Sequence, residues 1–387
     1  MTKNIALNDR QSAPPVRRKT IAIFGIKYYP SKGGTSRVAE SIIHELKEKY
    51  DITIYCYPDP EAANYMSNVK VISMPQFPMG SVGVFMYYAL CSIHLLFSKK
   101  YDLIHVHKTD SAFFIPLLSW KGKVIATSHE APYLRDKWSA VGRAYFRFME
   151  SVFIRSSATL TSVSKPLADY YFQTYQREVL YLPNGVDLDP RRNDQAAETL
   201  LRAHGVEGDF LFFAARRIMS TKGCHTFLQA MKKINYQGPI VIAGQESHGA
   251  PYLQLIKSLA KGLNVKFIGF VGDRPTLMAL VERARYFIFP SELEGLSLML
   301  LEVGSTGITP LICSDIPQNT QVFSDREVLF FRNKDVDDLA EKFQWAENHP
   351  EEMATKMKQA KDWVYQEYSS EVFATRYDTL YQQVINT

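Results

Sequence analysis

The sequence predicts an α/β protein built from two doubly wound domains, each with a parallel sheet. Three observations lead to this prediction. Short apolar segments alternate with amphipathic helical segments along the chain, as they do in βαβ units. A turn rich in Pro, Asn and Gly at residues 183–187 interrupts this alternation, which then begins again. The length of 387 residues is enough for two or three domains with ample cores.

The first half of the chain begins, in this prediction, with a disordered basic arm at residues 1–18, which lacks the apolar segment of a signal peptide. A βαβ unit follows, in which Gly33 and Gly34 lie between the first strand and an amphipathic helix. Glycines at such a place let the backbone approach a ligand closely. The expected elements are strands at residues 19–26, 51–57, 69–74, 101–107, 124–128, 159–164 and 179–182, and helices at residues 36–49 and 164–175.

Residues 79–97 form the most apolar segment of the chain. The uninterrupted apolar run is shorter than the about 20 residues that a membrane span needs, and the segment contains Ser92 and His94. We therefore expect a core helix, with a helix lying on a bilayer as the alternative.

The second half repeats the alternation. Strands are expected at residues 210–214, 240–243, 265–269, 286–289 and 310–313, and helices at residues 298–305, 336–346, 350–368 and 371–385. Arg216, Arg217 and Lys222 follow the first of these strands. Cations at the carboxyl end of a strand suit a pyrophosphate, because guanidinium and ammonium groups donate charged hydrogen bonds to its oxygens.

Two carboxylates, Glu294 and Glu302, are separated by seven residues in a loop that joins an apolar strand to an apolar helix. A glycine-containing loop that opens a helix in a parallel sheet is a typical anion site. Two carboxylates would repel a phosphate unless they bind a neutral group beside it. Sugar hydroxyls are such groups, because they donate hydrogen bonds to carboxylates. The local chemistry therefore indicates a phosphate flanked by sugars, which is a nucleotide sugar.

Composition and charge narrow the function further. With 46% hydrophobic and 22% charged residues, the chain is typical of soluble globular proteins. The net charge of +5 suits a phosphorylated substrate or anionic lipid and is too small to indicate nucleic acid. The cysteines form no C-x-x-C pair, so neither a zinc site nor a disulfide framework is indicated, and a reducing cytoplasm is the simplest compartment.

The spacing of Glu294 and Glu302 resembles the Glu-x7-Glu signature of the retaining family-four (group 1) glycosyltransferases. Five other segments are similar to that family in order and spacing: Lys32-Gly33-Gly34, Pro183-Asn184-Gly185-Val186-Asp187, Arg217 through Lys222-Gly223, and the strands at residues 241–244 and 265–271. The resemblance covers roughly residues 19–385. It implies the GT-B fold, with two Rossmann-like domains facing each other across a cleft. The expected parts are a domain at residues 19–187 for the acceptor, a domain at residues 188–368 for the donor, and a final helix at residues 369–387 that returns to the first domain.

The resemblance also implies roles for individual residues. Arg217, or Arg216 where the family usually has glycine, would bind the diphosphate together with Lys222. Glu302 would bind the ribose and Glu294 the transferred sugar, while His129 would lie beside that sugar and His107 is interpreted as structural. Further residues expected to contact the donor are Gly33, Gly34, Phe270, Val271, Gly295, Leu296, Ser297 and Leu298.

The implied reaction is transfer of a hexosyl group from a UDP-, GDP- or dTDP-sugar to a hydroxyl of a glycan or polyprenyl-linked acceptor. No cofactor and no metal are expected, because Asp187-Leu188-Asp189 lies in the linker and the metal-binding Asp-x-Asp belongs to the other glycosyltransferase fold. The family suggests bacterial surface-polysaccharide synthesis on the inner face of the cell membrane, with a peripheral contact to anionic lipid. A segment at residues 134–138 resembles the Trp-rich segment of rhamnosyltransferase-like members. A sugar-nucleotide epimerase of the same fold and a non-catalytic nucleotide-sugar-binding protein are the alternatives.

Overall fold

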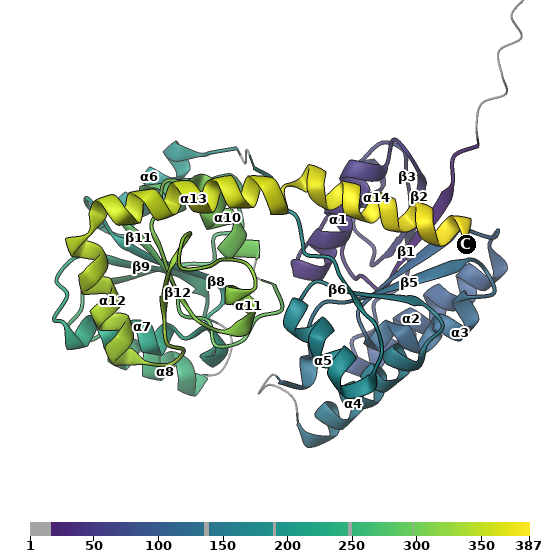
Figure 1. The fold of residues 1–387 in the computed structure, drawn as a ribbon, viewed down its shortest axis with the longest axis horizontal. Helices are drawn as coiled ribbons and strands as arrows, with labels where there is room; N and C mark the ends of the chain where they lie inside the picture. The colour runs from purple at the N-terminus through teal and green to yellow at the C-terminus, as the bar shows by residue number, and fades with distance from the viewer. Residues whose placement is uncertain (1–16, 135–138, 189–190, 247–249, 297) are drawn as a thin grey trace, which may run out of the picture.

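The first domain is built around a seven-stranded parallel sheet with the order β3-β2-β1-β4-β5-β6-β7 (Figure 1). The structure is a computed structural model and describes residues 17–134, 139–188, 191–246, 250–296 and 298–387. The strands of this sheet are β1 (Thr20–Phe24), β2 (Asp51–Cys56), β3 (Val69–Ser73), β4 (Leu103–His107), β5 (Lys123–Ser128), β6 (Thr159–Ser162) and β7 (Leu180–Tyr181). The central strands consist mainly of apolar residues that are buried on both faces, as expected for a parallel sheet covered on two sides.

The second domain contains a six-stranded parallel sheet with the order β10-β9-β8-β11-β12-β13. Its strands are β8 (Leu211–Arg217), β9 (Ile240–Gln245), β10 (Val265–Gly269), β11 (Tyr286–Phe289), β12 (Leu311–Ser314) and β13 (Leu329–Phe331). The two-domain α/β architecture that the sequence predicts is therefore confirmed.

In each sheet the strand order reverses once, between β1 and β4 in the first sheet and between β8 and β11 in the second. The connections that leave the carboxyl ends of two such strands run to opposite faces, which opens a crevice between them. Ligands of open α/β sheets bind at these crevices. The strand order alone therefore directs attention to the loops after β1, β4, β8 and β11.

Helices cover both faces of the first sheet. One face packs on α1 (Gly34–Leu46) and on the last helix of the chain, α14 (Ser370–Asn386), through Phe373, Tyr377 and Tyr381. The other face packs on α2 (Gly80–Phe97), α4 (Ala140–Arg155) and α5 (Lys165–Tyr175). The short helices of this domain are η1 (Ala62–Asn64), η2 (Asp110–Phe114), α3 (Ile115–Leu118) and η3 (Pro132–Leu134). Full burial of a side chain such as Phe373 stabilises the fold by about 1.5–3 kcal/mol, so α14 contributes to the core of the first domain.

The second sheet is covered in the same way. One face packs on α6 (Asp194–Ala203), α9 (Arg274–Arg283), α10 (Leu298–Thr306) and α13 (Pro350–Tyr368). The other packs on α7 (Cys224–Lys233), α8 (Ala250–Leu259) and α12 (Val336–Asn348). The short helices η4 (Ser220–Lys222) and α11 (Pro317–Thr320) lie in loops that follow β8 and β12.

The chain passes between the domains twice, and the two passages are hydrogen-bonded to each other. The amide of Val186 donates to the carbonyl of Tyr368 at 2.8 Å, and the amide of Ser370 donates to the carbonyl of Val186 at 3.1 Å. Ser369 then caps α14 by accepting a hydrogen bond from the amide of Val372. The expected domain boundary at residue 187 falls between β7 and α6, and α14 packs on the first domain after the bend at residues 368–370 (Figure 1).

Most expected elements occur within a few residues of their predicted bounds. The first helix begins at Gly34 rather than at residue 36. The helices α4, α6, α7, α8 and α9 had no predicted bounds. The strand β13 was not predicted, because Leu329-Phe330-Phe331 is too short to give a periodic signal. The expected arm at residues 1–16 and the Trp-rich segment at residues 135–138 lie outside the described residues.

The expectation of a core helix at residues 79–97 holds for only one side of α2. Gly83, Tyr87, Tyr88, Cys91 and Leu95 are buried, whereas the opposite side is exposed. By length and composition alone, α2 is the one helix among the described residues that could cross a membrane, and only 33% of it is buried in the protein.

Candidate functional site

The loops after β8 and β11 meet at the crevice of the second sheet. Gly223 follows η4 with a left-handed φ of 67°, and a Cβ at this position would lie 1.8 Å from the carbonyl oxygen of Pro290, so only glycine fits. The amide of Glu292 donates to the carbonyl of Thr221 at 2.9 Å. These main-chain contacts hold the lysine-bearing loop directly against the loop that carries Glu294.

Lys222 and Glu294 form an ion pair in this crevice. The Nζ atom of Lys222 lies 2.5 Å from Oε1 of Glu294, and the two side chains are 28% and 11% exposed. The pair lies just ahead of α7 and α10, whose first amides can bind an anion. A cation, a carboxylate and two helix N-termini are thus gathered at one end of the sheet.

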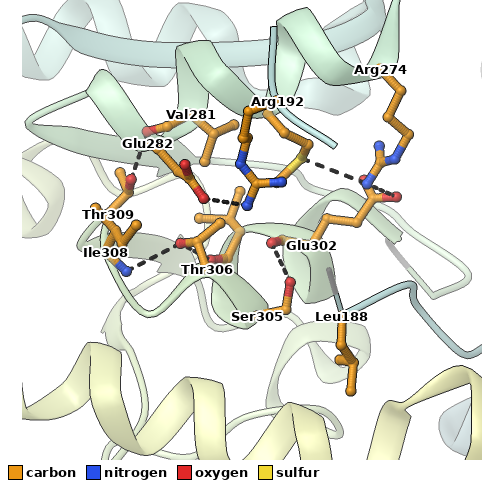
Figure 2. Close-up of polar contacts among 12 residues, drawn as sticks. Leu188, Arg192, Arg274, Val281, Glu282, Glu302, Ser305, Thr306, Ile308 and Thr309 are labelled. Carbon is orange, nitrogen blue, oxygen red and sulfur yellow. Dashed lines mark hydrogen bonds and ion pairs between the residues drawn. The ribbon is translucent and has the colours of Figure 1, made fainter. Parts of the chain in front are cut away.

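Glu302 lies on α10 and is nearly buried. The guanidinium of Arg274, at the start of α9, forms an ion pair with it, and Figure 2 shows the two side chains pointing toward each other. Burial lowers the pKa of Arg274 from its ordinary value, and Glu302 opposes this shift. Arg37 of α1 in the first domain reaches the same carboxylate at 3.3 Å. Glu302 is therefore a point of electrostatic contact between the two domains.

Three guanidinium groups gather where the first domain meets the second. Arg216 lies against Gly33, since a Cβ on this glycine would be 2.8 Å from Nη1 of Arg216. Burial lowers the pKa of Arg216, and the neighbouring Arg217 and Arg37 lower it further. The buried Nε atom of Arg217 has no hydrogen-bond partner among the described residues. This concentration of positive charge beside a glycine loop is suited to an anion with several oxygens.

A row of histidines lies at the carboxyl ends of β4 and β5. The Nδ1 atom of His107 is 3.0 Å from Nε2 of His129, and Nδ1 of His105 is 2.7 Å from the hydroxyl of Tyr381 in α14. Burial lowers the pKa of His107 to about 3, with a contribution from Lys108, and burial together with His107 holds the pKa of His129 well below its usual value. Both imidazoles are therefore neutral near pH 7, so one donates and the other accepts in the bond that joins them.

His129 lies against the second domain and also lines a cavity of about 170 Å³ in the first domain. A Cβ on Gly295 would lie 2.3 Å from the carbonyl oxygen of His129, so the loop after β11 touches the loop after β5. The cavity is lined by residues of the first domain: Lys27, Thr35, Ser81, Val84, Lys108, Thr109, Asp110, His129, Glu130, Pro132, Tyr145 and Phe146. Lys108 has a left-handed φ of 76°, a strained conformation that is common at binding sites.

Two family models match the chain in succession. "Glycosyltransferase Family 4" matches residues 32–190, and "Glycosyl transferases group 1" matches residues 197–363. The chain belongs to the group 1, family 4 glycosyltransferases. It is an enzyme of this family, as the sequence predicts, and the fold is GT-B.

Curated relatives of this glycosyltransferase are distant. It is 23% identical over 224 residues to a GDP-mannose:cellobiosyl-diphosphopolyprenol alpha-mannosyltransferase of Komagataeibacter xylinus, with 56% of this chain and 55% of the relative covered. It is 25% identical over 322 residues to a UDP-Gal:alpha-D-GlcNAc-diphosphoundecaprenol alpha-1,3-galactosyltransferase of Escherichia coli, with 77% and 80% covered. The alignment thus spans little more than half of the mannosyltransferase.

Among solved structures, sucrose-phosphate synthase from Thermosynechococcus elongatus has a similar fold. Its TM-score is 0.81 at 19% identity, with 95% of this chain and all of the other chain covered. At this identity the likeness shows the fold alone.

The structure of the glycosyltransferase brings most of the predicted site residues to the two crevices. Gly34 starts α1 beside Gly33, and nothing lies within 4 Å of the place where its Cβ would be. Phe270 and Val271 follow β10, whereas Lys222 and Glu294 follow β8 and β11. The side chain of Phe270 is 55% exposed. Leu296 is packed in the core, so only its main chain can reach a ligand, and Leu298 is partly buried. Ser297 lies outside the described residues.

Sequence reasoning missed the two arginines that contact Glu302. Arg37 lies on the first turn of α1, directly after the predicted glycine loop, and its position there was a usable signal. Arg274 follows Asp273, which caps α9, and nothing in the local sequence distinguishes it from an exposed helix residue. It also missed Glu292, which is paired with Lys334 at 3.1 Å and lies 3.4 Å from His225. Among the residues that the structure describes, no three His, Cys, Asp or Glu side chains are grouped to hold a metal ion.

Proposed function

We propose that this enzyme transfers a hexosyl group from a nucleotide sugar to a hydroxyl of a lipid-linked acceptor, with retention of the anomeric configuration. The observation that carries the proposal is the Lys222–Glu294 pair at the crevice of the second sheet, with His129 of the first domain beside the same loop. Such a site offers a cation for the diphosphate of a nucleotide sugar and a carboxylate for the hydroxyls of its sugar.

The donor would bind with its diphosphate near Arg216, Arg217 and Lys222, where the positive charge of the crevice is concentrated. Guanidinium groups bind two phosphate oxygens at once, and an ammonium group neutralises further charge. Glu302 is poised to accept hydrogen bonds from ribose hydroxyls, with Arg274 fixing its orientation. The exposed ring of Phe270 would provide a surface for the base.

In the transfer step, the bond from the sugar C1 to the diphosphate oxygen breaks and a bond from C1 to the acceptor oxygen forms on the same face. The acceptor proton passes to the leaving diphosphate, which needs no further base. Lys222, the arginines and the start of α10 would stabilise the charge that grows on the diphosphate. Glu294 would hold the transferred sugar, and neutral His129 would donate or accept one hydrogen bond at that sugar.

The acceptor would bind in the first domain, in the cavity beside His129. Lys27 and Lys108 line this cavity and suit the diphosphate of a lipid-linked glycan. The curated relatives act on diphosphopolyprenol-linked acceptors and use GDP-mannose or UDP-galactose. The proposal includes action on polysaccharide precursors in the cytoplasm, and the four cysteines, all free and buried, suit such a reducing compartment.

A panel of UDP-, GDP- and dTDP-sugars tests the proposal. Each donor is scored by thermal shift, and the stabilising donors are then incubated with a synthetic lipid-diphosphate-linked sugar while nucleotide release is measured. We expect one donor to be consumed and NMR of the product to show the donor's anomeric configuration. Conversion of the donor into its epimer without transfer, or binding without turnover, would refute the proposal in favour of an epimerase or a binding protein.

A further inference from the structure

One side of α2 presents a line of apolar side chains to solvent. Met79, Val82, Met86, Ile93 and Phe97 are 56%, 58%, 38%, 50% and 89% exposed. At 3.6 residues per turn, these five positions fall within about 60° of one another around the helix axis. The line therefore runs along the whole length of α2, and we refer to these five residues as the apolar stripe.

The opposite side of α2 is fixed to the first domain, so the helix cannot rotate to bury the apolar stripe. The hydroxyl of Tyr87 donates to the carbonyl of Ile26 at 2.7 Å, and the hydroxyl of Tyr88 donates to the carbonyl of Gly25 at 3.3 Å. Cys91 and Leu95 are fully buried on the same side. These attachments also mean that α2 cannot cross a bilayer without unfolding the domain.

Lysines and an exposed tryptophan lie beside the carboxyl end of the stripe. The amide of Tyr101 donates to the carbonyl of Lys121 at 2.8 Å, and Nζ of Lys121 donates to the carbonyl of Ser98 at 2.5 Å. These bonds place the turn after α3, with Trp120 78% exposed, against the end of α2. The lysines gathered by this contact are Lys99, Lys100, Lys121 and Lys123.

Further exposed apolar side chains extend the surface beyond α2. Phe113 of η2 and Leu117 of α3 are 42% and 41% exposed, and the ring of Phe113 lies 5.3 Å from that of Phe85 in α2. The helices α2, η2, α3 and α4 pack on one another in one part of the first domain (Figure 1). Large apolar side chains exposed together on neighbouring helices indicate an interaction site.

We propose that the apolar stripe, together with Trp120 and the adjoining lysines, binds the surface of a bilayer that contains anionic phospholipid, with α2 lying in the plane of the membrane. The chemistry is that of an interfacial helix: apolar side chains enter the acyl boundary, an aromatic ring lies at the headgroup level, and lysines bind the negative headgroups. A protein partner of matched shape would not need lysines placed at one end of the stripe.

The same helix connects this surface to the cavity of the proposed acceptor site. Ser81 and Val84, in the first two turns of α2, line the cavity on the side away from the stripe. Membrane binding itself does not depend on the transfer reaction, so the two proposals can fail separately.

The test is sedimentation of the full chain with vesicles made of equal parts phosphatidylglycerol and phosphatidylcholine. The apolar contribution is tested with Ile93→Glu, and the matched control is Ile308→Glu in the second domain, since both isoleucines are 50% exposed. The charge contribution is tested with the double variant Lys99→Glu, Lys100→Glu against the control Lys261→Glu, Lys358→Glu, which has the same net charge. Val82→Glu replaces Ile93→Glu if that variant does not fold.

We expect the wild type and both controls to sediment with the anionic vesicles, and each stripe or lysine variant to partition at least about tenfold more weakly, since one lysine near an anionic surface contributes about a fivefold factor. Phosphatidylcholine vesicles and high salt should weaken binding of the wild type. Equal sedimentation of Ile93→Glu and Ile308→Glu would overturn the proposal, as would the absence of wild-type sedimentation. A change of Ile93→Glu from dimer to monomer without vesicles would instead assign the stripe to a second copy of the chain and overturn membrane binding.

Discussion

The pairing of Glu294 with Lys222 predicts that removing the carboxylate leaves diphosphate binding intact or improves it while turnover falls. Glu294→Gln is the perturbation. The amide of the variant still accepts a hydrogen bond from the charged ammonium, so what is lost is the ion pair, which contributes up to about 1 kcal/mol when the partners are partly exposed. The 2.5 Å contact of two largely buried groups supports a loss of this size. Lys222 would then bind a nucleoside diphosphate up to about fivefold more tightly.

Two calorimetric titrations of the variant, one with the nucleoside diphosphate and one with the intact donor, measure the effects on binding. The turnover assay measures the effect on the reaction. Glu292→Gln is the control, because Glu292 is 14% exposed, pairs with Lys334 rather than with Lys222, and changes charge in the same way. The control should bind diphosphate like the wild type. A folded Glu294→Gln variant that binds the diphosphate tenfold more weakly would refute the reasoning, since Glu294 would then contact the nucleotide or hold Lys222 in place.

Four further outcomes are expected. Lys222→Ala should weaken diphosphate binding by about 1.5–3 kcal/mol by calorimetry, and unchanged affinity in the folded variant would show that the ammonium points elsewhere. Glu302→Gln should weaken binding of both the diphosphate and the donor, and should bind a 2′-deoxynucleoside diphosphate as well as its ribose counterpart; a retained preference for ribose would contradict the assigned contact. Turnover should persist in EDTA, and loss that Mn²⁺ or Mg²⁺ restores would count against a metal-independent reaction. His105, His107 and His129 have lowered pKa values, so below about pH 6.5 the unfolded chain binds more protons than the folded one and the free energy of unfolding should decrease on acidification. In urea titrations at several pH values, His107→Gln should reduce this dependence on pH. An unchanged dependence would contradict the neutral state of His107.

The alternation of strands and helices could be predicted from the sequence because parallel strands buried on both faces leave continuous apolar runs. The Glu-x7-Glu loop and Lys222 were also predictable, since each follows such a run at the carboxyl edge of the sheet. Arg37 and Arg274 could not be assigned to Glu302 from the sequence. Their contact depends on the separation of two domains and on helix packing, which no local pattern specifies.

For α2 the sequence favoured a core helix, with a helix lying on a bilayer as the alternative, and the reason is a different one. Its residues are apolar nearly all the way round, which is the pattern of a core helix. Which side of α2 is buried depends on the helices and strands around it, and the local sequence does not specify these. Composition therefore identifies the helix as unusual, and the fold decides which of its sides faces solvent.

The two passages of the chain between the domains meet at Val186 and Ser369, and this arrangement creates a single pivot. Both covalent connections lie at one point, so the second domain can swing about it without stretching either passage. The loop of Gly295 in the second domain touches the main chain of His129 in the first, so a rotation at the pivot would change the distance between them. A Cβ on Gly185 would meet Cβ of Phe373 at 2.6 Å, so Gly185→Ala would force the two passages apart at the pivot.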